Sequence, residues 1–177
     1  DLPLDYRFTE ASSNLSVSNI YSDNMMFQAD QELVISGKGV CGSEVKAVIK
    51  NMDTGEEFSG SDIAKDISDW EINLGVFENG GNYELLISSE NEKLEFANIT
   101  FGDIWVFAGQ SNMEFPILFS QNRKELLEQA NNSNLRFCRV YRNVSTEVPR
   151  MKEPQFEATV VWGRGDSASA LDLSLIH

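Results

Sequence analysis

A serine that follows an apolar run is the residue of this chain best placed to do chemistry. Ile104-Trp105-Val106-Phe107 is continuously apolar, ends at Ala108-Gly109, and is followed two positions later by Ser111. Such a run is typical of a parallel strand buried on both faces. Ser111 is then expected, exposed, at the carboxyl edge of the sheet, where open α/β sheets bind ligands. If a helical turn follows, the Ser111 N–H could stabilise an oxyanion there. A serine that only caps the next turn is the alternative.

A serine nucleophile also needs a base that takes its proton and an acid that orients the base. The single histidine is His177, the last residue, and Asp172 precedes it by five positions. On a helix this offset turns the two side chains toward different faces. We therefore expect a frayed terminus rather than a catalytic pair.

The residues around Ser111 carry a more specific pattern. Gly102-Asp103-Ile104-Trp105, followed by Gly109-Gln110-Ser111-Asn112-Met113-Glu114, closely resembles the first block of the sialate O-acetylesterase family of SGNH hydrolases. Upstream, Ile20-Tyr21-Ser22-Asp23-Asn24-Met25-Met26-Phe27-Gln28, with its sequel Gly37-Lys38-Gly39, resembles the N-terminal region of that family. The resemblance covers most of the first 120 residues.

This resemblance implies a reaction and a substrate. Ser111 would attack an acetyl ester through an acyl-enzyme, and the substrate would be an O-acetylated sugar. That sugar is sialic acid in the animal members and a plant-type polysaccharide in related ones. Gln110 and Asn112 flank Ser111 and are interpreted as shaping the turn and the substrate pocket.

The resemblance also implies an Asp-x-x-His block near the end of a much longer chain. Asp172 and His177 do not have that spacing, and residues 163–177 fit the family poorly. We therefore expect this chain to be an N-terminal fragment that is inactive by itself.

The first hundred residues are expected to form a small β-sandwich, because short strands alternate with turns and no helical period lies between them. Asp53-Thr54-Gly55 closes one strand, and Asn79-Gly80-Gly81-Asn82 is typical of a hairpin turn. The predicted strands are Leu33–Ile35, Val45–Ile49, Trp70–Leu74, Tyr83–Ile87 and Leu94–Phe96.

After Thr100 the pattern changes to a strand–helix–strand unit. Asn122 is expected to cap a helix, with Glu125 at the capping-box position, and Leu135–Tyr141 is the second strand. Gly163 to Ser167 is interpreted as turn-like. We thus expect a β-rich domain over residues 1–100. Residues 101–177 would be the first, truncated part of a flavodoxin-like, SGNH-type α/β esterase domain.

The aromatic residues of the first hundred leave a rival hypothesis open. Trp70, Tyr83 and Phe96 could line a sugar-binding face, but three aromatics spread over a sandwich are interpreted as core. Met25-Met26-Phe27 is likewise interpreted as core filling. The rival is a non-catalytic carbohydrate-binding or adhesion module in which the Ser111 turn is vestigial.

Composition narrows the possible partners. The 177 residues carry a net charge of −14, which repels nucleic acid and anionic membranes, so neither is an expected partner. No apolar run approaches the roughly 20 residues of a membrane span. No Cys/His/carboxylate cluster has metal-site spacing and no glycine-rich phosphate loop occurs, so neither a metal nor another cofactor is expected.

Four N-glycosylation sequons favour a secretory-pathway protein, secreted or lysosomal, whose signal peptide is not in this chain. If they are used, their asparagines must lie on the surface. They are Asn14, Asn98, Asn131 and Asn143.

Two cysteines, Cys41 and Cys138, allow at most one internal disulfide. Both stand in strand-like apolar contexts, so two buried free thiols are at least as good an interpretation.

Overall fold

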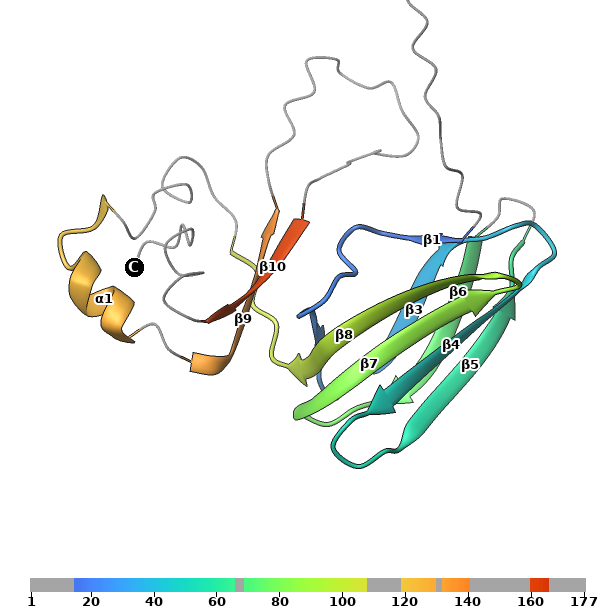
Figure 1. Ribbon diagram of the computed structural model, residues 1–177, viewed down its shortest axis with the longest axis horizontal. Coiled ribbons are helices and arrows are strands. Elements are labelled where there is room, and N and C mark those ends of the chain that lie inside the picture. Colours follow the sequence, from blue (N-terminus) through green and yellow to red (C-terminus); the bar gives the residue numbers. More distant parts are fainter. Residues whose placement is uncertain (1–14, 66–68, 108–118, 130–131, 141–159, 166–177) are drawn as a thin grey trace, which may run out of the picture.

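The computed structural model describes residues 15–65, 69–107, 119–129, 132–140 and 160–165. These residues form a β-sandwich and, beside it, a short helix and a two-stranded ribbon (Figure 1). The sandwich confirms the β-rich architecture that the sequence predicts for its first hundred residues.

One sheet of the sandwich has the order β1-β3-β6, and the other has the order β2-β8-β7-β4-β5. All pairs are antiparallel except β2 and β8, which run parallel. Each predicted strand falls inside an observed one. The strands are β1 (Ser16–Val17), β2 (Met26–Gln28), β3 (Glu32–Lys38), β4 (Glu44–Asn51), β5 (Glu57–Ile63), β6 (Asp69–Val76), β7 (Gly80–Ser89) and β8 (Glu92–Gly102).

Alternating side chains explain why these strands bury one face. In β6, Trp70, Ile72 and Leu74 are buried, while Glu71 and Asn73 between them are exposed. This is the period of two that a half-buried strand requires. The buried faces of the two sheets meet in one apolar core.

Along one side of the sandwich the sheets are joined by β5 and β6. A Cβ on Gly60 of β5 would lie 2.6 Å from Cγ2 of Ile72, so only glycine allows this approach. Nearby, the Asp62 carboxylate accepts the backbone N–H of Glu71 at 3.0 Å.

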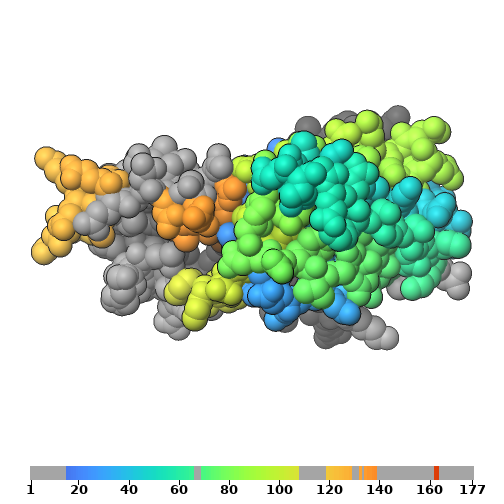
Figure 2. Space-filling view, turned by 90° about the horizontal axis from the view of Figure 1, so that it is seen from below, coloured from blue at the N-terminus to red at the C-terminus, as the bar shows by residue number. Residues whose placement is uncertain are grey.

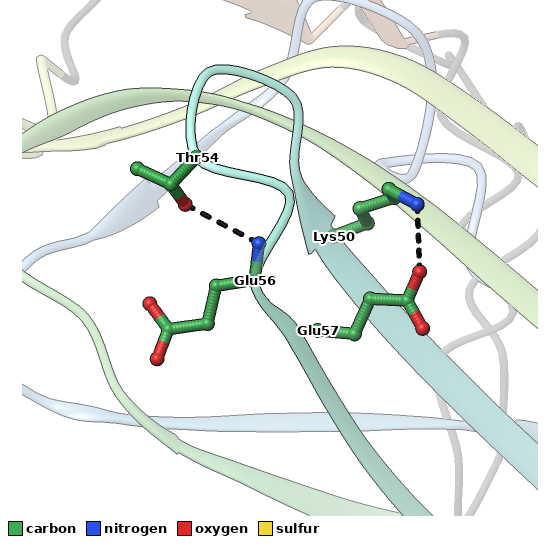
Figure 3. Close-up of polar contacts among 4 residues, drawn as sticks. All are labelled: Lys50, Thr54, Glu56 and Glu57. Atoms are coloured by element: carbon green, nitrogen blue, oxygen red, sulfur yellow. Dashed lines mark hydrogen bonds and ion pairs between the residues drawn. The ribbon is translucent and has the colours of Figure 1, made fainter.

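The turn between β4 and β5 lies where Asp53–Gly55 predicts it. The Thr54 hydroxyl accepts the N–H of Glu56 at 3.3 Å, and the Lys50 ammonium lies 2.7 Å from the Glu57 carboxylate (Figure 3). These contacts hold the two strands in register beside the turn.

The hairpin predicted at Asn79–Asn82 is wrong, because β6 and β7 belong to different sheets. Gly80 and Gly81 do have positive φ, at 100° and 77°. However, Phe77 just before them is buried and stacks on Phe101, with ring centroids 4.5 Å apart. Burial of Phe77 takes the chain across the end of the core instead of back along the same sheet.

The buried strand predicted at Ile104–Phe107 is also absent. β8 ends at Gly102, and the next residues have no strand partner among those the structure describes. Trp105 and Val106 are 78% and 87% exposed, and Figure 2 shows this yellow stretch on the surface. An apolar strand is buried only where neighbouring strands and covering helices meet it, and none does so within the described residues.

The helix after Asn122 is confirmed as α1 (Arg123–Gln129), and Leu126 N–H donates to the Asn122 carbonyl at 3.0 Å. The following strand is confirmed as β9 (Asn132–Val140). Its partner is β10 (Val160–Gly165), which runs antiparallel. The strand–helix–strand unit with parallel strands, expected to open an α/β domain here, is therefore not observed in the described residues and stays a prediction. The predicted domain boundaries also stay predictions.

The turn predicted from Gly163 is wrong for residues 163–165, which lie in β10. Gly163 pairs with Phe137 of β9, and a Cβ on Gly163 would lie 2.3 Å from the Phe137 ring. The glycine thus marks a place where an aromatic ring packs on a strand backbone, rather than a turn.

The core interpretation of the aromatics is confirmed. Trp70 and Tyr83 are buried, Phe96 is half-buried against the core, and Met25 is buried as well. No aromatic side chain in residues 15–65 and 69–102 is exposed.

The two cysteines are free thiols. Cys138 is half-buried in β9, and this burial raises the pKa of its thiol. Cys41 is exposed in the turn between β3 and β4, so the expectation of a buried thiol is wrong there.

Candidate functional site

The predicted nucleophile Ser111 and its neighbours Gln110 and Asn112 lie outside the described residues, as do Asp172 and His177. Their roles stay predictions. The structure does describe the junction that leads to them. There, residues 103–107 leave the end of β8, and the ribbon β9–β10 lies beside the sandwich (Figure 1).

One side of this junction is the run Ile20–Gln28, here called the bracket segment. It lies along β8: the Asp23 carboxylate accepts the N–H of Ala97 at 2.8 Å, and the Asn24 N–H donates to the carbonyl of the same Ala97 at 3.0 Å. Its last residues form β2, in parallel register with the end of β8.

Gln28 links the bracket segment to the chain that leaves β8. Its Oε1 accepts the backbone N–H of Ile104 at 2.9 Å, and its Nε2 donates to the Ala29 carbonyl at 3.3 Å. The Ala29 N–H in turn donates to the Gly102 carbonyl at 3.0 Å. Ile104, two residues after the end of β8, is therefore held by a hydrogen bond from the bracket segment.

Asn24, Asn98 and Arg136 form a second link, between the sandwich and β9. Arg136 Nη2 donates to Asn98 Oδ1 at 3.1 Å, and Asn98 Nδ2 donates to Asn24 Oδ1. Both asparagines have left-handed backbones, with φ of 66° at Asn24 and 57° at Asn98. Asparagine tolerates this conformation better than most residues, which explains the residue type at both positions.

Trp162 of β10 makes a third link. Its indole Nε1 donates to the Ile20 carbonyl at 2.7 Å, and its ring packs partly against the sandwich core. Ile104 and Trp162 thus contact the bracket segment directly, and Arg136 contacts it through the Asn98 side chain.

The middle of the bracket segment is apolar and packed. The Tyr21 ring lies 6.1 Å from Phe27 and 6.3 Å from Phe96, and burial raises the pKa of the Tyr21 hydroxyl. The segment is therefore fixed by packing as well as by its hydrogen bonds.

Of the predicted glycosylation sites, Asn14, Asn131 and Asn143 lie outside the described residues. Asn98 is half-buried, and the nitrogen to which a glycan would attach donates to Asn24. A glycan at Asn98 would compete with that link.

The described part of the chain contains no group of three or more His, Cys, Asp or Glu side chains that could hold a metal ion. It also contains no helix long and apolar enough to cross a membrane.

Sequence reasoning missed the roles of Gln28, Arg136 and Trp162. A signal for Gln28 is the run Ile20–Gln28, which carries part of the family resemblance and in which only Met25-Met26-Phe27 is interpreted as core filling. Its polar members contact residues more than seventy positions away, and spacing alone does not show such pairs.

Comparison with known proteins places this architecture among the carbohydrate acetylesterase folds. A carbohydrate acetylesterase from Xanthomonas citri superposes with a TM-score of 0.76 over 90% of this chain and 34% of its own, at 22% sequence identity. No family model matches the chain.

Two curated relatives show a more particular similarity. The sialate O-acetylesterases of Homo sapiens and Pongo abelii are each 26% identical over 105 residues, 57% of this chain. The chain is thus similar in sequence to the sialate O-acetylesterases, the family that its sequence resembles. It aligns with 20% of the length of each of these relatives.

Proposed function

We propose that this chain supplies the nucleophile of a serine esterase that removes O-acetyl groups from sugars, and that Ser111 is that nucleophile. The observation that carries the proposal is the intact run Gly109-Gln110-Ser111-Asn112-Met113-Glu114 in a chain similar in sequence to the sialate O-acetylesterases.

In the proposed reaction, Ser111 Oγ attacks the acetyl carbonyl carbon while a base takes its proton. The sugar oxygen leaves with a proton, and water then releases acetate from the acyl-enzyme. The base is the histidine of an Asp-x-x-His block, which this chain does not show with the family spacing. Gln110 and Asn112 shape the pocket around the ester.

The proposed substrate is O-acetylated sialic acid, on the strength of the names of the curated relatives. Acetylated plant polysaccharide is the second substrate class to assay. A free acetyl ester such as 4-nitrophenyl acetate reports the chemistry without the sugar.

The test is Ser111→Ala in the full-length protein, assayed on these three substrates. Ser59→Ala is the matched control, because Ser59 is exposed on β5. We expect Ser111→Ala to lower kcat by at least about 10³-fold and Ser59→Ala to leave it unchanged. Full turnover by Ser111→Ala would refute the proposal. A preference for acetylated polysaccharide would change the proposed substrate, but Ser111 would remain the proposed nucleophile.

The 177-residue chain assayed alone should turn over essentially no acetyl ester. Without a base, the Ser111 hydroxyl stays protonated at neutral pH and is a poor nucleophile. Robust turnover that Ser111→Ala abolishes would show that Asp172 and His177, or another base, complete the site after all.

A further inference from the structure

We propose that the bracket segment, Ile20–Gln28, holds Ile104, Arg136 and Trp162 against the sandwich, and that Gln28 is a positioning residue for the reaction. The effect of Gln28 on the reaction rests on the proposed function, whereas the contacts made by the bracket segment do not.

The bracket segment is suited to this role because its own place in the sandwich is fixed at several points. Met25 is 2% exposed, and β2 pairs in register with β8. Asp23 and Asn24 each hydrogen-bond to the backbone of Ala97. Functional groups are placed most precisely when the elements that support them are rigid.

The segments it holds come from three different parts of the chain. Ile104 follows β8, Arg136 lies in β9, and Trp162 lies in β10. Each is tied to the bracket segment by one of the three links, the Arg136 link passing through Asn98. A single nine-residue run of the sandwich, Ile20–Gln28, therefore gathers the chain on both sides of Ser111.

Gln28 is the link nearest to Ser111, seven positions upstream of it at Ile104. Residues 104–107 have no strand partner within the described part of the chain, so a backbone ladder does not fix them there. The Gln28 side chain supplies that missing contact. Its Nε2 donates to the Ala29 carbonyl while its Oε1 accepts the Ile104 N–H, so both polar atoms of the amide have a partner.

Three substitutions distinguish the contribution of the Oε1 acceptor from that of the size of the side chain. Gln28→Met keeps length and volume but removes the acceptor. Gln28→Asn keeps the amide but withdraws it by one methylene. Gln28→Glu keeps an oxygen that can accept the Ile104 N–H. Gln31→Met is the matched control, because Gln31 is exposed three residues away.

The first measurement is hydrogen–deuterium exchange of the Ile104 amide in the 177-residue chain, followed by NMR. Loss of one hydrogen bond should speed exchange about 2- to 10-fold in Gln28→Met and Gln28→Asn. Gln28→Glu and Gln31→Met should stay within twofold of wild type. Unchanged exchange at Ile104 in both Gln28→Met and Gln28→Asn would overturn the positioning role.

The second measurement is ester hydrolysis by the full-length protein. A displaced nucleophile lowers turnover more than binding, so Gln28→Met should reduce kcat about 10-fold or more with KM within twofold, and Gln28→Glu should recover it. A reduction that Gln28→Glu shares with Gln28→Met would indicate a merely structural role and overturn the inference. Activity retained by Ser111→Ala would overturn the proposed function alone, because the exchange result at Ile104 does not depend on it.

Discussion

At the scale of single residues, the two left-handed asparagines of the junction show how residue type follows from backbone geometry. Asn98 has a φ of 57° and uses both polar atoms of its side chain, one toward Asn24 and one toward Arg136. The same residue opens a sequon, Asn98-Ile99-Thr100. A glycan at Asn98 would replace one of the two hydrogens on the nitrogen that donates to Asn24, at a half-buried position.

We therefore predict that Asn98 carries no glycan when the chain is expressed through a secretory pathway. Thr100→Val removes the sequon without changing Asn98, and the intact mass of the secreted protein should change only by the difference between the two side chains. Ser16→Ala, Ser133→Ala and Ser145→Ala, which remove the other three sequons, provide the comparison. A mass loss of one glycan in Thr100→Val would contradict the prediction.

Gly37 shows a second residue type set by close approach. A Cβ there would lie 2.2 Å from the Ser16 carbonyl oxygen and 2.5 Å from the Trp70 ring. At Gly39 the nearest atom would be 3.3 Å away, in Val45. The two glycines of the Gly37-Lys38-Gly39 run thus differ in how much space they leave.

Gly37→Ala should lower the free energy of unfolding by about 1–3 kcal/mol, because β1 or Trp70 must move. Gly39→Ala should cost clearly less. Urea denaturation of both variants beside wild type measures the difference. Equal stabilities for the two variants would mean that β1 shifts freely and that Gly37 is not required by packing.

At the scale of elements, the contact between β5 and β6 decides how the two sheets are joined. Asp62 of β5 accepts the N–H of Glu71 in β6, and this hydrogen bond is the main cause that lowers the pKa of the Asp62 carboxyl. The charged form of Asp62 is therefore favoured in the folded state.

A lowered folded pKa stabilises the protein above the ordinary aspartate pKa near 3.9, and this stability is lost as the pH falls through the lowered value. Asp62→Ala should lower the melting temperature at pH 7, and the difference from wild type should shrink toward pH 2. Asp53→Ala, in the exposed β4–β5 turn, is the control. A difference that stays constant from pH 7 to pH 2 would show that the charge of Asp62 has no part in it.

At the scale of the whole molecule, the main feature is the exposed apolar stretch between the sandwich and the residues around Ser111. Ile104, Trp105, Val106 and Phe107 are 45%, 78%, 87% and 65% exposed. Contiguous apolar surface of this kind favours association.

The 177-residue chain should therefore self-associate as its concentration rises, and Trp105→Ser with Val106→Ser should reduce this. Light scattering coupled to size-exclusion chromatography measures the mass at several concentrations. The control is Val76→Ser, a 59% exposed side chain on β6 away from the stretch. Equal association by the double variant and by the control would refute the prediction.

Local pattern alone determined much of this protein. Alternating side chains predicted the strands of the sandwich, Asn122 predicted the start of α1, and the run around Ser111 predicted the family. Each of these depends on residues close together in the chain, whose spacing reflects local backbone period or local motif chemistry.

Only the tertiary structure decided which elements meet. Asn79–Asn82 has the residues of a hairpin, but burial of Phe77 takes the chain to the other sheet. Gly163 has the residue type of a turn, but the Phe137 ring packs on it within a strand. Gln28 reaches Ile104 across seventy-six positions of sequence. Such contacts are set by the shape of the folded core, and a sequence pattern read over a few residues cannot specify them.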